Sequence, residues 1–528
     1  MKIKTEYVKN TIFPGFIYSA VTGIITGSVI FLFKISANKV IKLSELIYGF
    51  SRNNPQYAIF LLLGAAVLGG LSAITVKQLG NCKGGGIPTS IAIISDLIEF
   101  KWLSNILVVF VSTLLSFLGG VPLGNEGPSV QMGTAVGRGV SKAFGKNHPA
   151  WDRYIMTGGA ASGFACATGA PITGIFFALE ETHRRFSSML FMSAAWAVIS
   201  ASLTMRVLCR IAGISPSLFD FILSDILPTK YVFGAAFVGI VCGLAAVLFT
   251  FLYKKIGRLI REGLRFLSPA VKITLVFVLV AVMGFFFKQS VGTGHNLIEL
   301  LFHGEFTLSA SLFYLCVRVI LLIIATNSGI TGGLFVPTLA FGAMIGSVCA
   351  KLLINTGLLP NQFYSLITVI GISAFLAASS HIPISAIIFS LEALSGINNI
   401  IPIVMGVAFS YITAEVLGEK SFVESVIESK VKYQNEGKKP KYLVASFKVQ
   451  KGSFAEGKEL NEILWPAYSV VTRLEKDKSY SEETLIEEGD LLHIHSKSYS
   501  VPTTVNKLEA LIGRQDDDIK MTVSDLEE

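Results

Sequence analysis

Apolar segments recur along most of this chain and are separated by short polar stretches. They lie near residues 12–36, 57–79, 104–120, 154–182, 188–213, 230–253, 271–287, 311–328, 337–356, 363–380 and 383–417. A helix that spans a bilayer needs about 20 apolar residues, and several of these segments are shorter or are interrupted by glycine or proline. Interrupted backbone is tolerated at membrane depth only where protein buries it or where it lines a cavity. The pattern predicts an all-α polytopic membrane protein with broken, tilted helices.

Two motifs occur twice in the same order. Residues 124–128 (GNEGP) and 332–337 (GGLFVP) each end in a proline that opens the pattern Pro-x4-Gly-x3-Gly. Downstream, Pro171 precedes Glu180 by nine positions, and Pro383 precedes Glu392 by the same nine. Distant repeats in an apolar chain are typical of transporters built from inverted halves, which bind substrate where the halves meet. We predict repeat halves at about 12–215 and 228–420.

Composition agrees with a membrane protein. The 528 residues are 52% hydrophobic and 15% charged, and the mean hydropathy is +0.62. These values argue against a soluble enzyme, so we expect no enzymatic activity, no cofactor and no metal site. The net charge of +8 is interpreted below as a topology signal, and we expect no nucleic-acid partner.

Basic residues are distributed unevenly around the two glycine-rich motifs. Those that follow the first motif are Arg138, Lys142, Lys146 and Arg153, whereas the matching stretch after the second motif carries Lys351 alone. Because cytoplasmic segments are enriched in Lys and Arg, the first stretch is predicted to face the cytoplasm and the second the outside. Lys2, Lys4 and Lys9 place the N-terminus in the cytoplasm by the same rule.

Composition changes near residue 420, where polar residues and short alternating runs replace the apolar segments. Alternation with period two is typical of strands. We predict a membrane domain over 1–425, a linker over 426–439 and a small cytoplasmic α/β domain over 440–513. The acidic end, 514–528, is predicted to be a disordered tail.

Three glycine-marked helix starts form a candidate anion site. Residues 84–88 (GGGIP), 124–128 and 333–337 each combine glycines with a proline suited to the first helical turn. Helix N-termini carry about half a positive charge and unpaired amides, so they attract anions. None of the three contains Lys or Arg, and a fixed cation would hold an anion too tightly for turnover. The candidate anion-binding residues are Gly84, Gly85, Gly86, Asn125, Gly127, Gly333, Leu334 and Phe335. The alternative is that each cluster is only a helix break.

Three carboxylates lie near these motifs. Glu126 stands inside GNEGP, where a carboxylate can occupy the anion site and compete with the ion. Glu180 and Glu181 follow the first Pro-led segment. From residue type alone, a solvated helix end beside Arg184 and Arg185 is the favoured interpretation of this pair.

These motifs resemble the CLC family of chloride channels and chloride/proton exchangers over about residues 12–425. The family signatures GSGIP, GxEGP and GxFxP match residues 84–88, 124–128 and 333–337 in order and spacing. The resemblance implies a homodimer in the cell membrane with one anion pathway per subunit. It places Glu126 at the external gate and Glu181 at the internal proton-transfer position.

The expected function is chloride transport across the cytoplasmic membrane in exchange for protons. The alternative on the same scaffold is a passive voltage- or pH-gated chloride channel. A Trk-like cation transporter would need a TVGYG-like carbonyl filter, and the sequence contains none.

Two positions depart from the family pattern. Gly85 aligns with the serine whose hydroxyl contacts the central anion, and Ile397 aligns with the tyrosine whose phenol contacts the same ion. Each replacement removes a side-chain donor. Weaker central binding, held mainly by backbone amides, is therefore expected.

The C-terminal region resembles the RCK (TrkA-C) domain of potassium-transport regulators. The resemblance is carried by residues 451–460 (KGSFAEGKEL) and 485–492 (LIEEGDLL). It implies a small-molecule or nucleotide ligand, such as the cyclic dinucleotides bound by some relatives. His493 and His495 alternate along one predicted strand, which favours a strand surface over a metal site.

Overall fold

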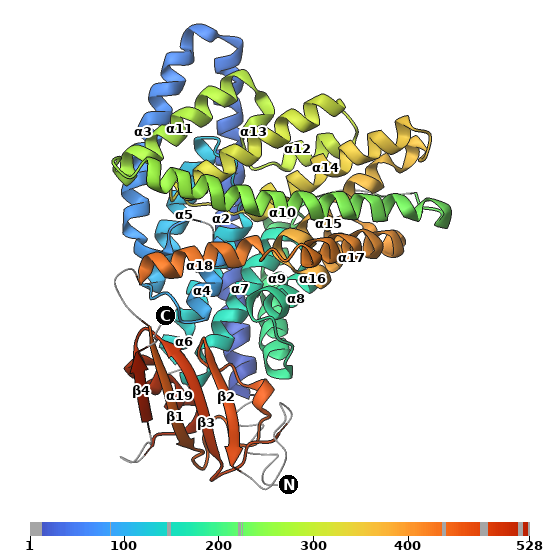
Figure 1. The fold of residues 1–528 in the computed structure, drawn as a ribbon. Coiled ribbons are helices and arrows are strands. Elements are labelled where there is room, and N and C mark those ends of the chain that lie inside the picture. The colour runs from blue at the N-terminus through green and yellow to red at the C-terminus, as the bar shows by residue number, and fades with distance from the viewer. Residues whose placement is uncertain are drawn as a thin grey trace.

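The structure is a computed structural model that describes residues 13–84, 86–144, 149–219, 223, 225–435, 440–475, 484–515 and 521–525. It is mostly helical, with a small C-terminal sheet set against one end of the helical body (Figure 1). Gly85, Lys146 and the basic N-terminal residues 1–12 lie outside the described parts, so the predictions made for them stay predictions.

Helices make up most of the described chain between Phe13 and Gln434. In the first half they are α2 (Phe13–Asn53), α3 (Ala58–Gln78), α4 (Gly86–Ile94), α5 (Trp102–Leu118), α6 (Glu126–Phe144), α7 (Asp152–Thr168), α8 (Pro171–Phe177) and α9 (Ser188–Ala212). In the second half they are α10 (Val232–Gly263), α11 (Pro269–Phe286), α12 (His295–Phe302), α13 (Leu308–Asn327), α14 (Phe335–Asn355), α15 (Tyr364–Ser380), α16 (Pro383–Ala393), α17 (Ile400–Val416) and α18 (Phe422–Gln434).

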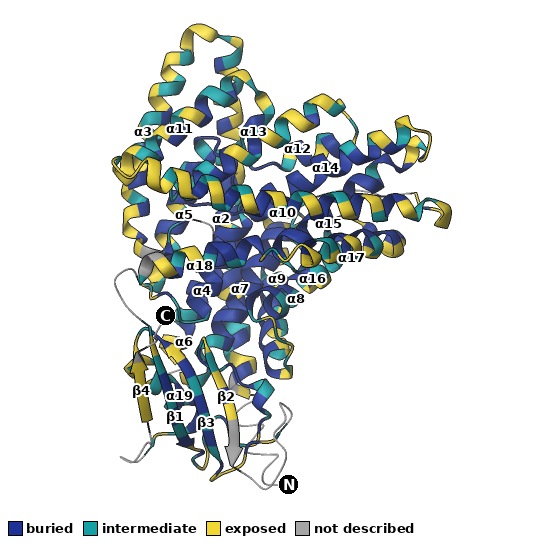
Figure 2. Ribbon diagram, in the orientation of Figure 1, coloured by how far each residue is buried: buried dark blue, intermediate teal, exposed yellow. Residues whose placement is uncertain are grey.

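Nine helical stretches within the described ranges are long and apolar enough to cross a membrane. The stretches that contain α14 and α15 are 78% and 89% buried, whereas the other seven are 28–44% buried. Exposed residues accordingly gather on outer helices such as α3 and α10, and α7 lies in the buried centre (Figure 2). Helices α14 and α15 are therefore core elements, which other parts of the protein cover instead of lipid.

The two halves repeat the same packing order. Helix α6 packs on α7 and α2 packs on α9; in the second half α14 packs on α15 and α10 packs on α17. These contacts explain why the spacing Pro-x4-Gly is repeated in both halves. A Cβ on Gly133 would lie 2.1 Å from the Gly159 carbonyl oxygen, and one on Gly342 would lie 2.6 Å from the Gly371 oxygen. Only glycine allows the backbones of these helix pairs to approach so closely.

Reciprocal caps tie the halves together. The Glu180 carboxylate accepts hydrogen bonds from the Ile384 and Ser385 amides, at 2.9 and 2.6 Å, and so caps the start of α16. Glu392 at the end of α16 accepts from the Ile172 and Thr173 amides, at 3.0 and 2.8 Å, and so caps α8. A contact made in both directions between equivalent positions is what a pseudo-two-fold axis produces. It explains why the Pro-to-Glu spacing is the same in both repeats, and Glu180 is a helix cap instead of a solvated helix end.

Replacing Glu392 with alanine is expected to destabilise the protein by about 2 kcal/mol. Hydrogen bonds to a charged group contribute about 1.5–3 kcal/mol each, and lost N-caps cost about 0.5–2 kcal/mol. The measurement is the thermal unfolding midpoint in detergent. Glu180→Ala should lower it similarly, whereas Glu262→Ala at the exposed end of α10 should not. Equal midpoints for all three variants would contradict a stabilising role of the caps.

The C-terminal part is a four-stranded antiparallel sheet in the order β2-β3-β1-β4. Its elements are β1 (Lys441–Lys448), β2 (Ser469–Glu475), β3 (Leu491–Ser498), α19 (Val501–Ile512) and β4 (Met521–Asp525). Alternate residues of β1 and β3 are buried, as the period-two pattern predicts. The histidines of β3 meet β1 side chains: His495 Nδ1 lies 2.6 Å from Tyr442 Oη and His493 Nδ1 lies 2.8 Å from Ser446 Oγ.

Two expectations for this region are wrong. Residues 521–525 were expected to be disordered, but they form β4, which pairs with β1 because Thr522 and Val523 suit an edge strand. The expected linker begins inside α18, which packs on α4. Residues 436–439 lie outside the described ranges.

The C-terminal part is docked on α7. Arg153 donates to the Leu464 carbonyl oxygen at 3.0 Å. Tyr154 Oη donates to the Glu462 oxygen at 2.7 Å and accepts from the Leu464 amide at 3.0 Å. Tyr154 is fully buried. One of the basic residues taken as a topology signal therefore also holds the C-terminal part in place.

Candidate functional site

The three glycine-rich motifs converge on one point. Gly124 and Gly333 pair like residues of adjacent antiparallel strands: the Gly124 amide donates to the Gly333 oxygen at 2.8 Å, and the Gly333 amide donates back at 2.7 Å. A Cβ on Gly127 would lie 2.7 Å from Gly333 Cα, and one on Gly86 would lie 1.9 Å from the Gly127 oxygen. No side chain fits between these backbones, which explains why the motifs carry glycine there.

The starts of three helices therefore meet. Helix α4 begins at Gly86, α6 at Glu126 and α14 at Phe335. Each helix leaves its first amides unpaired within the helix and carries a partial positive charge at that end. The arrangement supplies positive potential from backbone alone, without Lys or Arg in the motifs.

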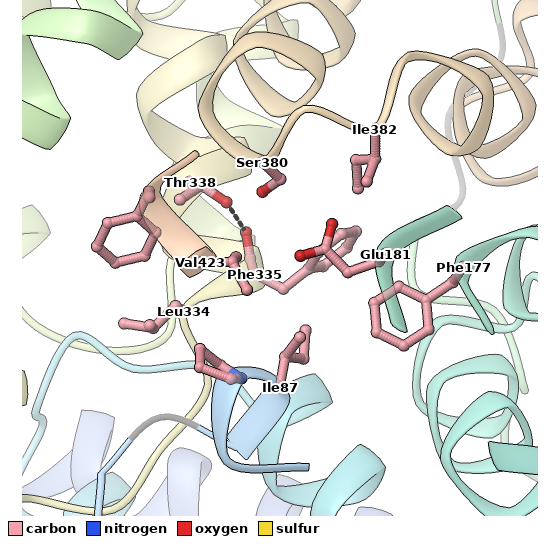
Figure 3. Close-up of a pocket in the computed structure, with 11 residues that line it drawn as sticks. Ile87, Phe177, Glu181, Leu334, Phe335, Thr338, Ser380, Ile382 and Val423 are labelled. Atoms are coloured by element: carbon pink, nitrogen blue, oxygen red, sulfur yellow. Dashed lines mark hydrogen bonds between the residues drawn. The ribbon is translucent and has the colours of Figure 1, made fainter. Parts of the chain in front are cut away.

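A small cavity of about 20 Å³ lies beside this convergence. It is lined by Ile87, Pro88, Phe177, Glu181, Leu334, Phe335, Thr338, Ser380, Ile382, Phe422 and Val423 (Figure 3). Its volume suits one water-sized guest. The lining is mostly apolar, and the Thr338 hydroxyl is already used in donating to the Phe335 oxygen at 2.6 Å.

Phe335 and Leu334 form one wall of this cavity. The Phe335 ring makes edge-on contacts with Phe164 and Phe389, with ring centroids 5.0 and 5.3 Å apart. These contacts come one from each half of the chain. They fix the start of α14, and with it the amides that face the cavity.

Glu181 points into the cavity. It lies on a single π-helical turn, Ala178–Thr182, that extends α8, and its carboxylate is directed into the space between Ser380 and Ile87 (Figure 3). The residue is 8% exposed, and its Oε2 atom has no hydrogen-bond partner in the described part of the chain. Widened turns of this kind are frequent at functional sites. Here the turn sends Glu180 to the α16 cap and Glu181 to the cavity.

Glu126 lies on the other face of the converging loops. It is the first residue of α6 and is completely buried. Neither carboxylate oxygen forms a hydrogen bond of ordinary geometry with the described residues, but the backbone amides of Asn125 and Val336 lie close enough to act on it. A Cβ on Gly124 would lie 2.6 Å from Glu126 Oε2 and 3.3 Å from Val336 Cβ, so this carboxylate is beside the start of α14.

One predicted site residue is misplaced. Ile397 is 70% exposed, lies on the turn Gly396–Asn399 and does not line the cavity. Val423, on the first turn of α18, occupies the cavity wall instead. The misplacement arises because α18 turns back against α4 after the last spanning helix. Val423 is aliphatic, so it supplies no phenol donor to this wall.

Several cavity residues carry no signal of their own in the sequence. Val423 and Phe422 follow the final span with no motif around them. Thr338 and Ser380 stand in apolar helices. Lys430 of α18 also approaches this region, donating to the Lys83 carbonyl and to Thr89 Oγ1, the latter at 2.6 Å. The nearness of these residues to the cavity follows from the packing of α18 on α4, which no sequence motif marks.

The sequence that carries these converging loops matches a known protein family. The profile of the voltage gated chloride channel family matches residues 64–415 of this chain. The chain belongs to the voltage gated chloride channel family. This confirms the family resemblance noted from the three motifs, and it covers the helices that carry Glu126, Glu181 and the start of α14.

Two curated proteins are similar to this chain in sequence. Two proteins named H(+)/Cl(−) exchange transporter ClcA, from two strains of Klebsiella pneumoniae, are 27% and 26% identical over 367 residues. Those residues are 69% of this chain and 77% of each relative.

Solved structures share the fold. A slow cyanobacterial Cl−/H+ antiporter superposes with a TM-score of 0.72 and 22% identity, over 80% of this chain and 99% of that one. A CLC-type fluoride/proton antiporter gives 0.64 and 21%, over 76% and 95%. A eukaryotic CLC transporter gives 0.66 and 18%, over 79% and 74%. These similarities show that the chain has the fold of this family, and they confirm the fold class predicted from the sequence.

Proposed function

We propose that the protein exchanges chloride for protons across the cytoplasmic membrane. The observation that carries the proposal is a pair of buried carboxylates, Glu126 and Glu181, placed around the start of α14 with no ordinary hydrogen bond to Glu126 or to Glu181 Oε2 in the described chain. The names of the two Klebsiella relatives support the same exchange. In this proposal Glu126 is the external gate of the anion path, and Glu181 transfers protons on the cytoplasmic side.

Burial makes both carboxylates suited to this work. A charged carboxylate without partners is costly to bury, so each can alternate between a neutral protonated form and a charged form. When charged, Glu126 lies beside the partial positive charge of α14 and competes with an anion. When protonated, it no longer competes, and an anion can enter. Proton and chloride binding are thereby made mutually dependent.

The assembly is proposed to be a homodimer with both termini in the cytoplasm. The excess of Arg and Lys from the second half of α6 to the start of α7 supports that orientation. Docking of the C-terminal part on α7, through Arg153 and Tyr154, puts that part on the same side. We further propose that the C-terminal part is an RCK-like regulatory domain with a small-molecule or nucleotide ligand.

A passive chloride channel is the second candidate. The aliphatic side chains of Ile87, Ile382 and Val423 line the cavity, and such a lining offers an anion few side-chain donors. A weakly held anion would leak without proton coupling. Reconstitution in liposomes separates the two: a chloride gradient drives proton movement through an exchanger and none through a channel.

Val423→Thr is expected to tighten chloride binding by up to about tenfold. The substitution is close to isosteric and adds one donor to the cavity, and a tenfold gain needs only about 1.4 kcal/mol, within the range of one hydrogen bond to an ion. Calorimetric titration with chloride measures it. Ile397→Thr is the matched control and should bind as the wild type does, because Ile397 is exposed. Tightening by the control variant, or none by Val423→Thr, would contradict the placement of the anion in this cavity.

A further inference from the structure

A histidine stands between Glu126 and solvent. His295 Nε2 lies 4.0 Å from Glu126 Oε1. The His295 side chain is 26% exposed, whereas that of Glu126 is 0% exposed. The imidazole therefore reaches solvent at one edge and the buried carboxylate at the other. The gap is about one ångström longer than a hydrogen bond, so a small approach or one water closes it.

The imidazole is held in this orientation. Its Nδ1 atom lies 2.8 Å from Thr293 Oγ1, and its ring contacts Phe219 at 5.6 Å between centroids. Helix α12 begins at His295 because Gly294 adopts φ +109°, where a Cβ would also lie 3.2 Å from Arg318 Nη2. The turn before α12 thus directs Nε2 toward Glu126.

The surrounding charges suit a group that passes a proton on. Burial lowers the pKa of the His295 imidazole, and the positive charges of Lys34 on α2 and Arg318 on α13 lower it further. Glu126 of α6 favours it. The carboxylate of Glu45 on α2 accepts from the neighbouring Asn296 at 2.7 Å.

In the described chain, the charged and phenolic groups of α14 and α15, which pack against α12, lie at its far end. Tyr364 of α15 lies beside Gly304, and Lys351 of α14 lies over the Tyr364 ring. Burial, Lys34 and Arg318 therefore disfavour a lasting positive charge on His295, and Glu126 is the nearby carboxylate that can accept its proton.

We propose that His295 carries protons between the external solution and Glu126. With Nδ1 donating its hydrogen to Thr293, Nε2 takes a proton from a hydronium ion, leaving water and an imidazolium. The N–H bond at Nε2 then breaks as the Glu126 oxygen takes that proton, leaving a neutral imidazole and a neutral carboxylic acid. Reversal of both steps releases the proton outward. This inference rests on the proposed role of Glu126 as gate.

The test is proton-coupled chloride exchange in liposomes as a function of external pH. His295→Phe should slow exchange about tenfold at an external pH of about 7.5, where hydronium is scarce, and leave it near the wild-type rate at about pH 5, where protons reach Glu126 directly. His303→Gln, at the exposed far end of the same helix, is the matched control and should behave as wild type at both values.

A second variant separates proton relay from a structural role. His295→Ala should be accelerated at neutral pH by imidazole added outside, since the free base replaces the missing side chain, and His303→Ala should not respond. A His295→Phe rate equal to wild type at about pH 7.5, or a pH-independent loss without imidazole rescue, would overturn the relay. If the wild type moves no protons at all, the proposed exchange itself fails, which is a different result from loss of the relay alone.

Discussion

Replacing Glu126 with glutamine is expected to abolish proton coupling while chloride flux persists. The amide has the shape of the protonated acid but cannot release a proton. It therefore leaves the anion path permanently open. We expect a fall of at least about 100-fold in proton flux driven by a chloride gradient, in line with the loss of an essential acid–base group, and a chloride flux that no longer depends on pH.

Glu305→Gln is the matched control, because Glu305 is an exposed carboxylate on the chain that follows α12. It should retain coupling. Uphill proton movement by Glu126→Gln, with chloride as the driving ion, would contradict the gate assignment. So would the loss of both fluxes in a variant that is still folded and inserted.

Replacing Glu181 with glutamine is expected to stop proton movement and leave chloride movement in place. Glu181 points into the cavity beside Leu334 and Phe335 (Figure 3), where its carboxylate can bind and release protons and an amide cannot. The fall in proton flux should again reach about 100-fold. Unlike Glu126→Gln, this variant keeps the gate carboxylate, so its chloride flux should keep its pH dependence.

The adjacent residue provides the control. Glu180→Gln removes a carboxylate one position away, but that carboxylate caps α16 at 2.6–2.9 Å and does not line the cavity. It should keep proton coupling and unfold at a lower temperature. Equal loss of proton flux in both variants would mean that the whole turn, and not the Glu181 carboxylate, is what the transport requires.

Much of the site could be predicted from local sequence. Glycine at 86, 127 and 333 is required where three backbones meet, and that requirement leaves a visible motif at each position. The Pro-x4-Gly spacing likewise records the close crossing of α6 with α7 and of α14 with α15. Convergence of the three loops could therefore be expected before the structure.

Other parts depend on contacts that the sequence does not mark. Val423 reaches the cavity because α18 folds back against α4, and a one-residue alignment without bracketing motifs placed that role on Ile397. His295 lies near Glu126 because a left-handed Gly294 turns α12 toward α6, which no periodicity records. The docking of the C-terminal part on Tyr154 is of the same kind, since a buried tyrosine in an apolar helix looks like any core residue.

The most direct test of the account is the direction of proton movement in liposomes that hold the wild-type protein at equal pH on both sides. An outward chloride gradient should draw protons inward although no proton gradient exists at the start. The internal pH should fall until the proton gradient that builds up balances the chloride gradient. His295→Phe should delay this change at neutral external pH, and Glu126→Gln should eliminate it. A chloride efflux of normal size with no change in internal pH would contradict proton exchange and identify the protein as a passive chloride channel.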